Sequence, residues 1–138
     1  MLWRKALIYR KSIIIVCAIT YISLLRESVV TLPPINSIDK YIHILMYLIF
    51  SWMLLWETRA TKWFQSGNSS NGWQTWKRYI IILGFPAIYG GFIEILQDKY
   101  FPPRTGDWQD WLADCIGVLI AGITWIIGQK WYARRMDK

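Results

Sequence analysis

The fold is decided by the stretch YIHILMYLIFSWMLLW, which covers residues 41–56 and contains no Asp, Glu, Lys or Arg. An apolar run of this kind is typical of a helix that crosses a lipid bilayer, for which roughly 20 residues are needed. Charged side chains stand directly on either side of the run, at Lys40 and Glu57. Since the run is short for a membrane span, we expect these flanking residues or local thinning of the bilayer to help at its ends.

Three further apolar stretches accompany this one, so the sequence predicts four transmembrane helices at about residues 7–25, 41–56, 79–97 and 108–131. Helices rather than a β-barrel follow from the length of the stretches and from the lack of short alternating segments. The chain is 54% hydrophobic and 17% aromatic, and a soluble core of 138 residues would not bury so much apolar surface. We therefore predict an all-α integral membrane protein, a four-helix bundle that forms a single domain over residues 1–138.

The basic residues are divided unequally between the two sides of this bundle. The richer side holds Arg4, Lys5, Arg10, Lys11, Arg59, Lys62, Lys77, Arg78, Lys130, Arg134, Arg135 and Lys138. The other side has Arg26, Lys40, Lys99 and Arg104. The positive-inside rule places the richer side in the cytoplasm, so we predict that both termini are cytoplasmic.

The net charge of +7 does not by itself indicate a nucleic-acid partner. The basic residues flank apolar stretches and form no basic stripe with interleaved aromatic residues in a soluble segment, which is the pattern of nucleic-acid binding. The basic N-terminus also lacks the features of a cleaved signal peptide, because residues 20–23 (TYIS) are too bulky for a cleavage site. We expect no nucleic-acid partner and an uncleaved first helix.

Ionisable residues within or near a membrane span are costly and are therefore functional candidates. The first group enters the second helix as Asp39-Lys40-x-x-His43-x-x-x-Tyr47. Asp39, His43 and Tyr47 are four residues apart and share one helix face. Asp39 taken alone is equally well explained as a helix cap that offsets the N-terminal dipole. His43 is the only histidine in the chain, and for this residue we favour a functional role.

The second group is Glu94-x-x-Gln97, at the predicted outer end of the third helix. The spacing places both side chains on one helix face. Because burial disfavours the charged form of a carboxyl group, we expect Glu94 to have a partner. A structural hydrogen bond between helices is the alternative interpretation of this pair.

The third group lies in the stretch FPPRTGDWQDWLAD, residues 101–114. Two prolines and a glycine interrupt the chain between helices. Asp107 has the position of a helix N-cap, and Asp110 strengthens the helix start three residues later. Asp114 lies too deep to cap the helix and needs a partner, for which we predict Arg104. We expect all three groups to meet in space, because all are predicted at the outer ends of helices.

Small residues that favour close packing between helices accompany these groups. Gly90 and Gly91 precede Glu94 in the third helix. Gly117 and Ala121 follow in the fourth helix, on the face that carries Asp110 and Asp114. We expect another helix to approach closely at both places.

These motifs together resemble the VanZ-like family, whose founding member is associated with resistance to the glycopeptide antibiotic teicoplanin. The resemblance covers about residues 12–130 and rests on Asp39-Lys40-x-x-His43-x-x-x-Tyr47, Glu94-x-x-Gln97, Pro103-Arg104 and Asp110-x-x-Ala113-Asp114-x-x-Gly117. Asp114 departs from the family pattern, because many relatives have Asn there. The resemblance implies a multi-pass protein of the bacterial plasma (inner) membrane with a role in antibiotic resistance or the cell envelope.

Three functions are compatible with the outward polar groups. In the first, which we favour, they bind a membrane lipid or a lipid-linked cell-wall precursor without catalysis, and Lys40, His43 and Arg104 hold its anionic part. In the second, the protein is a membrane-embedded enzyme in which His43 and Glu94 act as an acid–base pair. In the third, the groups are interhelical contacts of a structural subunit.

The candidate site residues follow from these interpretations. The catalytic candidates are His43, Glu94 and Asp114. The sequence indicates no cofactor; a carboxylate-rich site with one histidine is compatible with a divalent metal, but no compact spacing such as His-Glu-x-x-His is present. The predicted ligand-binding residues are Asp39, Lys40, His43, Tyr47, Glu94, Gln97, Arg104, Asp110 and Asp114.

Overall fold

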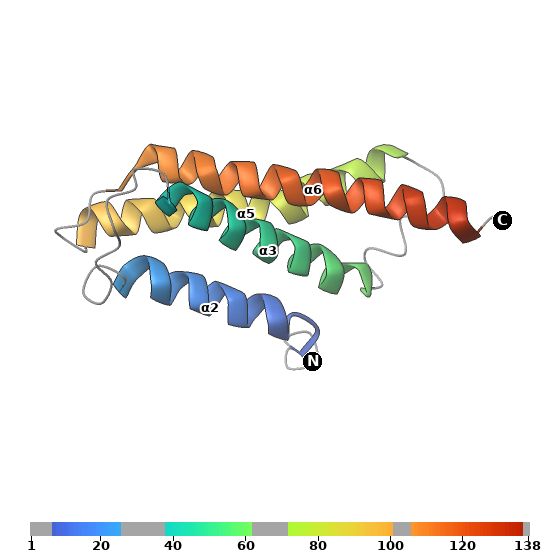
Figure 1. Cartoon of the computed structure of the whole chain (residues 1–138). Helices are drawn as coiled ribbons and strands as arrows, with labels where there is room; N and C mark the ends of the chain where they lie inside the picture. Colours follow the sequence, from blue (N-terminus) through green and yellow to red (C-terminus); the bar gives the residue numbers. More distant parts are fainter. Residues whose placement is uncertain (1–6, 26–37, 62–71, 101–105, 137–138) are drawn as a thin grey trace.

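The computed structural model describes residues 7–25, 38–61, 72–100 and 106–136. Successive helices run in opposite directions, so the start of the first and the end of the last lie at the same end of the bundle (Figure 1). The predicted all-α fold and its four helices are confirmed. These helices are α2 (Arg10–Leu25), α3 (Ile38–Arg59), α5 (Gly72–Tyr100) and α6 (Trp108–Met136).

The helices differ in length from the predicted spans. α3 has 22 residues, which at about 1.5 Å per residue covers the ~30 Å hydrocarbon core. The apolar run is short, and the helix reaches this length because it continues through the charged residues on both sides of the run. α5 and α6 have 29 residues each, whereas α2 has 16. Within the described ranges, three helices are long and apolar enough to cross a membrane: α3, α5 and α6.

The apolar and polar side chains are distributed as in a membrane protein. Large apolar side chains are exposed along the bundle, for example Ile49 in α3, Ile88 in α5 and Ile123 in α6. Lipid accepts such a surface, while polar groups must find partners between the helices. The chain is therefore a multi-pass membrane protein whose interior combines hydrophobic clusters with buried polar groups. Among the described residues, the buried polar and charged side chains are Ser12, Ser23, His43, Ser51, Glu57, Thr58, Glu94, Gln97, Asp110 and Asp114.

The most extensive helix–helix contact is between α3 and α6. A Cβ atom added to Gly117 would lie 2.3 Å from the carbonyl oxygen of Ile44 in α3, so no larger residue fits without a backbone shift. Ala121, one turn further along α6, is fully buried. The prediction that these small residues allow close packing is confirmed, and α3 is the helix that they contact.

α2 is attached to the bundle by hydrogen bonds near both of its ends. At its start, the backbone N–H groups of Lys11 and Ser12 donate to the Glu57 carboxylate of α3, at 3.0 and 3.1 Å. Near its end, the Gln97 amide nitrogen of α5 donates to the Ser23 carbonyl oxygen at 2.7 Å. The first N–H groups of a helix have no partner within the helix, so Glu57 caps α2 from a neighbouring helix.

Candidate functional site

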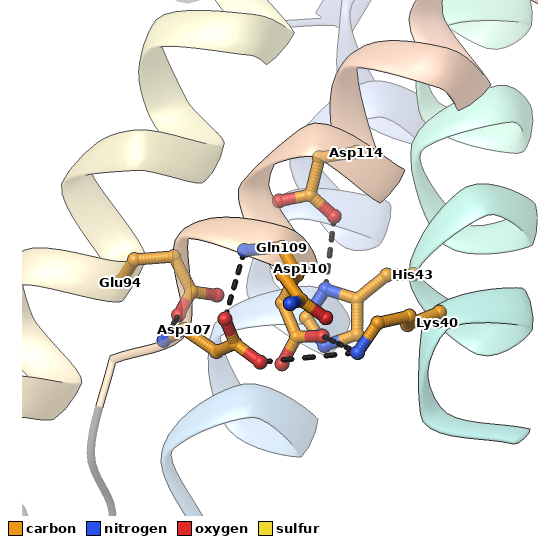
Figure 2. A network of polar contacts seen from close by, with 7 residues as sticks. All are labelled: Lys40, His43, Glu94, Asp107, Gln109, Asp110 and Asp114. Carbon is orange, nitrogen blue, oxygen red and sulfur yellow. Dashed lines mark hydrogen bonds and ion pairs between the residues drawn. The ribbon is translucent and has the colours of Figure 1, made fainter. Parts of the chain in front are cut away.

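Polar side chains from α3, α5 and α6 meet where α3 and α6 begin and α5 ends; we call this the cluster end of the bundle (Figure 2). The expectation that the three sequence groups meet is confirmed. One ring nitrogen of His43 and one carboxylate oxygen each of Glu94 and Asp114 all lie within 4.8 Å of one another. We define the polar cluster as Asp39, Lys40, His43, Glu94, Asp107, Asp110 and Asp114.

His43 and Asp114 form the most deeply buried pair of the cluster. The Nδ1 atom of His43 lies 2.9 Å from Oδ1 of Asp114, and the two residues are only 2% and 1% exposed. An ionised carboxylate only accepts hydrogen bonds, so with Asp114 ionised Nδ1 is the donor. We predicted Arg104 as the partner of Asp114; Arg104 lies outside the described residues, and the partner that the structure shows is His43.

Glu94 reaches the cluster from α5 and is 8% exposed. Its Oε2 atom accepts a hydrogen bond of 3.0 Å from the backbone N–H of Asp107, at the start of α6. Its Oε1 atom is buried and has no hydrogen-bond partner among the described residues. A buried carboxylate oxygen without a partner costs free energy, because its hydration has been lost and nothing replaces it.

Asp107 has two functions where the sequence indicated one. Its Oδ1 atom accepts from the N–H of Gln109 at 2.8 Å, so the predicted N-cap is confirmed. Its own N–H group also orients Glu94, which the sequence did not reveal because that bond joins two helices.

Lys40 lies at the rim of the cluster, beside two carboxylates of α6. Its Nζ atom is 3.8 Å from Asp107 Oδ2 and 3.9 Å from Asp110 Oδ1. Asp110 also belongs to a second group of close ligand atoms, with Asp39 and His43. In the described part of the chain, the carboxylates of the polar cluster outnumber its cationic side chains. The cluster therefore favours cations and hydrogen-bond donors.

Tyr47 and Gln97 are placed differently from the rest of the predicted set. Tyr47 is buried in the hydrophobic core with Phe50 and borders the cluster from within. Gly90 makes room there, since a Cβ atom on it would lie 3.2 Å from Tyr47 Cε1 and 2.6 Å from Asp114 Oδ2. Gln97 bonds to α2 instead, as in the alternative interpretation of this residue as an interhelical contact.

An open groove of about 540 Å³ lies beside the polar cluster, between the end of α5 and the start of α6. Its two tryptophans, Trp108 and Trp111, were not among the predicted site residues. Their spacing of three residues at a helix start is the signal that could have found them, because tryptophan is enriched at membrane–water boundaries. Glu94 belongs both to this groove and to the polar cluster. The groove is lined by Gly91, Glu94, Ile95, Asp98, Lys99, Gly106, Trp108 and Trp111.

The VanZ/LLP1 family model matches residues 3–129 of the chain. The chain belongs to the VanZ/LLP1 family. The match includes every residue of the polar cluster, and it confirms the resemblance drawn from the motifs. VanZ itself is associated with teicoplanin resistance. Comparisons with curated proteins and with solved structures gave no match.

The site of this VanZ/LLP1 protein has three chemical capacities. Its carboxylates accept hydrogen bonds from hydroxyl and amide groups. Its His43–Asp114 hydrogen bond holds an imidazole in one orientation, which general acid–base chemistry requires. Its close His43, Glu94 and Asp114 atoms are of the types that coordinate a divalent metal.

Proposed function

We propose that this VanZ/LLP1 protein binds the polar head of a membrane-embedded envelope molecule, such as a lipid-linked cell-wall precursor, and thereby protects the cell against teicoplanin-type antibiotics. The observation that carries this proposal is that Glu94 lies in both the open groove and the buried polar cluster. A head group in the groove therefore has direct access to an acidic hydrogen-bonding surface.

The groove has a composition suited to such an amphiphilic ligand. Trp108 and Trp111 offer aromatic faces and Ile95 an apolar wall, while Asp98 and Lys99 add charged groups. Its volume of about 540 Å³ falls within the roughly 300–1,000 Å³ of small-molecule sites. Carboxylates at the inner side accept from sugar hydroxyl and peptide amide groups, which are abundant in cell-wall precursors.

The proposed orientation places the polar cluster on the outer face of the plasma membrane. The described basic residues at the end opposite the cluster include Lys11, Arg59 and Arg135. The positive-inside rule assigns that end, with both termini, to the cytoplasm. The cluster end then faces the compartment where glycopeptides act.

Teicoplanin susceptibility tests this proposal in a sensitive bacterial host that expresses the wild type, Glu94→Gln or His43→Ala. Membrane levels of the three proteins are matched by quantitative immunoblot. Protection by the wild type that both variants lose supports a functional outward cluster. Equal protection by all three, or none by the wild type, contradicts the proposal. If the variants lose protection only in proportion to folded protein, the cluster has a structural role instead.

A catalytic role is the second candidate, and the His43–Asp114 hydrogen bond favours it. With Nδ1 engaged by Asp114, Nε2 is the nitrogen left to exchange a proton with a substrate. Incubation of the purified protein with a fluorescent lipid-linked precursor separates the two functions. Retention of the precursor with unchanged mass supports binding, whereas a product of altered mass that requires His43 supports an enzyme.

A further inference from the structure

We infer that His43, Glu94 and Asp114 form a binding site for a divalent cation of the zinc type. The three residues come from three different helices, α3, α5 and α6. Their candidate ligand atoms lie within 4.8 Å of one another, and all three residues are buried. Two ligands of a tetrahedral Zn²⁺ ion lie roughly 3.3–3.6 Å apart, because each is about 2.0–2.2 Å from the metal. Side-chain rotations that shorten the widest of these separations by roughly 1–1.5 Å would close the site.

The unpaired Oε1 atom of Glu94 is the observation that points to a ligand at this position. The side chain is more than nine-tenths buried, and its other oxygen is held by the Asp107 N–H at 3.0 Å. Figure 2 shows Glu94 directed from α5 toward the space beside Asp110 and Asp114. Ligating carboxylates are commonly held in this way, with one oxygen on the metal and a hydrogen bond that sets their orientation. A cation would satisfy the oxygen that no described residue contacts.

The charge of the surroundings favours a cation at the same place. Lys40 lies at the rim, where its ammonium group is paired with Asp107 and Asp110 rather than with the inner carboxylates. Among the described residues, His43 is then the only group of the inner site that can carry positive charge, and only when protonated. An imidazole with two carboxylates is a ligand set that suits Zn²⁺. Three protein ligands leave a fourth position open, and Glu94 lies on the groove wall.

Metal content of the purified full-length protein in detergent tests this inference directly. The protein is treated with EDTA, desalted, incubated with Zn²⁺ and analysed by mass spectrometry of the metal. We expect about one Zn²⁺ per chain and a rise in Tm on adding Zn²⁺, because a cation that binds only the folded state stabilises it. Substoichiometric binding without a Tm shift by the wild type overturns the inference, whatever the variants do.

Variants locate the ion. Glu94→Gln and Asp114→Asn should each weaken Zn²⁺ binding by at least about tenfold in competition with a coloured chelator, since changes one shell further out already cost roughly 10–100-fold. Glu57→Gln is the matched control, because it removes a buried carboxylate at the opposite end of the bundle. If the wild type and the three variants bind Zn²⁺ with equal affinity, the assignment of Glu94 and Asp114 as ligands is wrong.

The test is independent of any lipid ligand. Replacement of Zn²⁺ by Co²⁺ gives visible absorption bands that depend on the ligand set, and these should change in Asp114→Asn. If the protein binds Zn²⁺ at this site but gives no teicoplanin protection, the cation site is supported and the proposed function is contradicted. If the protein gives teicoplanin protection but binds no Zn²⁺, the groove is supported as a binding site and the cation site is contradicted.

Discussion

The imidazole of His43 and the carboxylate of Asp114 lie 71 positions apart in the sequence and 2.9 Å apart in the structure. Their hydrogen bond joins α3 to α6 at the cluster end of the bundle, next to the close approach of Gly117 in α6 to Ile44 in α3. Both residues are almost completely buried, so neither has water as an alternative partner. The bond therefore both stabilises the packing of α3 against α6 and fixes the position of the His43 imidazole in the site.

Removal of one partner of this bond should destabilise the protein. His43→Ala leaves the Asp114 carboxylate buried without its partner, and we expect a loss of about 3 kcal/mol in the free energy of unfolding. Asp114→Asn retains an oxygen that accepts from Nδ1, so its loss should be about 1 kcal/mol. Thermal unfolding of both variants in the same detergent measures the difference, and equal Tm values for His43→Ala and wild type would contradict it.

The close contact of α3 with α6 should make Gly117 intolerant of larger residues. Gly117→Ala places a methyl group against the backbone of α3, and we expect a loss of about 1–3 kcal/mol. Gly128→Ala is the matched control in the same helix, since a Cβ atom there meets nothing within 4 Å. This control should be neutral or stabilising by up to about 1 kcal/mol, because alanine is the better helix former. Chemical unfolding in detergent distinguishes the two.

The Glu57 cap should hold the start of α2 against the bundle. Glu57→Ala removes the acceptor of two backbone N–H groups, those of Lys11 and Ser12, and should cost about 1–2 kcal/mol. We expect faster amide hydrogen exchange in the first turn of α2 than in the wild type. Glu57→Gln keeps an amide oxygen and should show a smaller effect. Unchanged exchange in Glu57→Ala would show that the cap does not stabilise this end.

The groove tryptophan Trp108 should contribute to antibiotic protection without contributing to folding. Trp108 is 67% exposed, so Trp108→Ala should leave Tm nearly unchanged. We expect Trp108→Ala to raise teicoplanin susceptibility severalfold. The control is Trp131→Ala, since Trp131 is 55% exposed and lies near the other end of α6. Equal susceptibility of the two variants would argue against the groove as the binding site.

The orientation of the bundle is tested with reporters on the C-terminus. A cytoplasmic C-terminus should give a fluorescent green fluorescent protein fusion and an inactive alkaline phosphatase fusion, because alkaline phosphatase folds only outside the cytoplasm. The opposite pattern would place the polar cluster inside the cell. The basic residues that predict the orientation include Arg134 and Arg135, so their replacement by Gln should weaken the preference for a cytoplasmic C-terminus.

Much of the fold was predictable because the bilayer imposes simple rules on local sequence. A helix must satisfy its own backbone in lipid, so an apolar run such as residues 41–56 implies a helix without knowledge of its neighbours. The ends of helices were less predictable. α3 continues from Ile38 to Arg59 because its flanking charged residues still form helix, and hydropathy does not report where hydrogen bonding stops.

The sequence predicted most of the charged residues of the polar cluster, but it predicted neither their bonds nor the tryptophans of the groove. The cost of an ionisable group in a membrane span is enough to identify His43, Glu94 and Asp114 from the sequence. Spacing along one helix shows which residues share a face, but it does not show which faces meet. Arg104, the predicted partner of Asp114, lies outside the described residues, and the partner that the structure shows, His43, reaches Asp114 across the bundle.

The sequence by itself determined that the chain is a helical membrane protein, which residues are costly to bury, and where small residues permit close approach. These properties depend on composition and on spacing within single helices. Only the tertiary structure decided that His43 bonds to Asp114, that the Asp107 N–H holds Glu94, and that the Glu94 Oε1 atom has no described partner. Such relations depend on the relative positions of α3, α5 and α6, which side-chain packing between the helices sets.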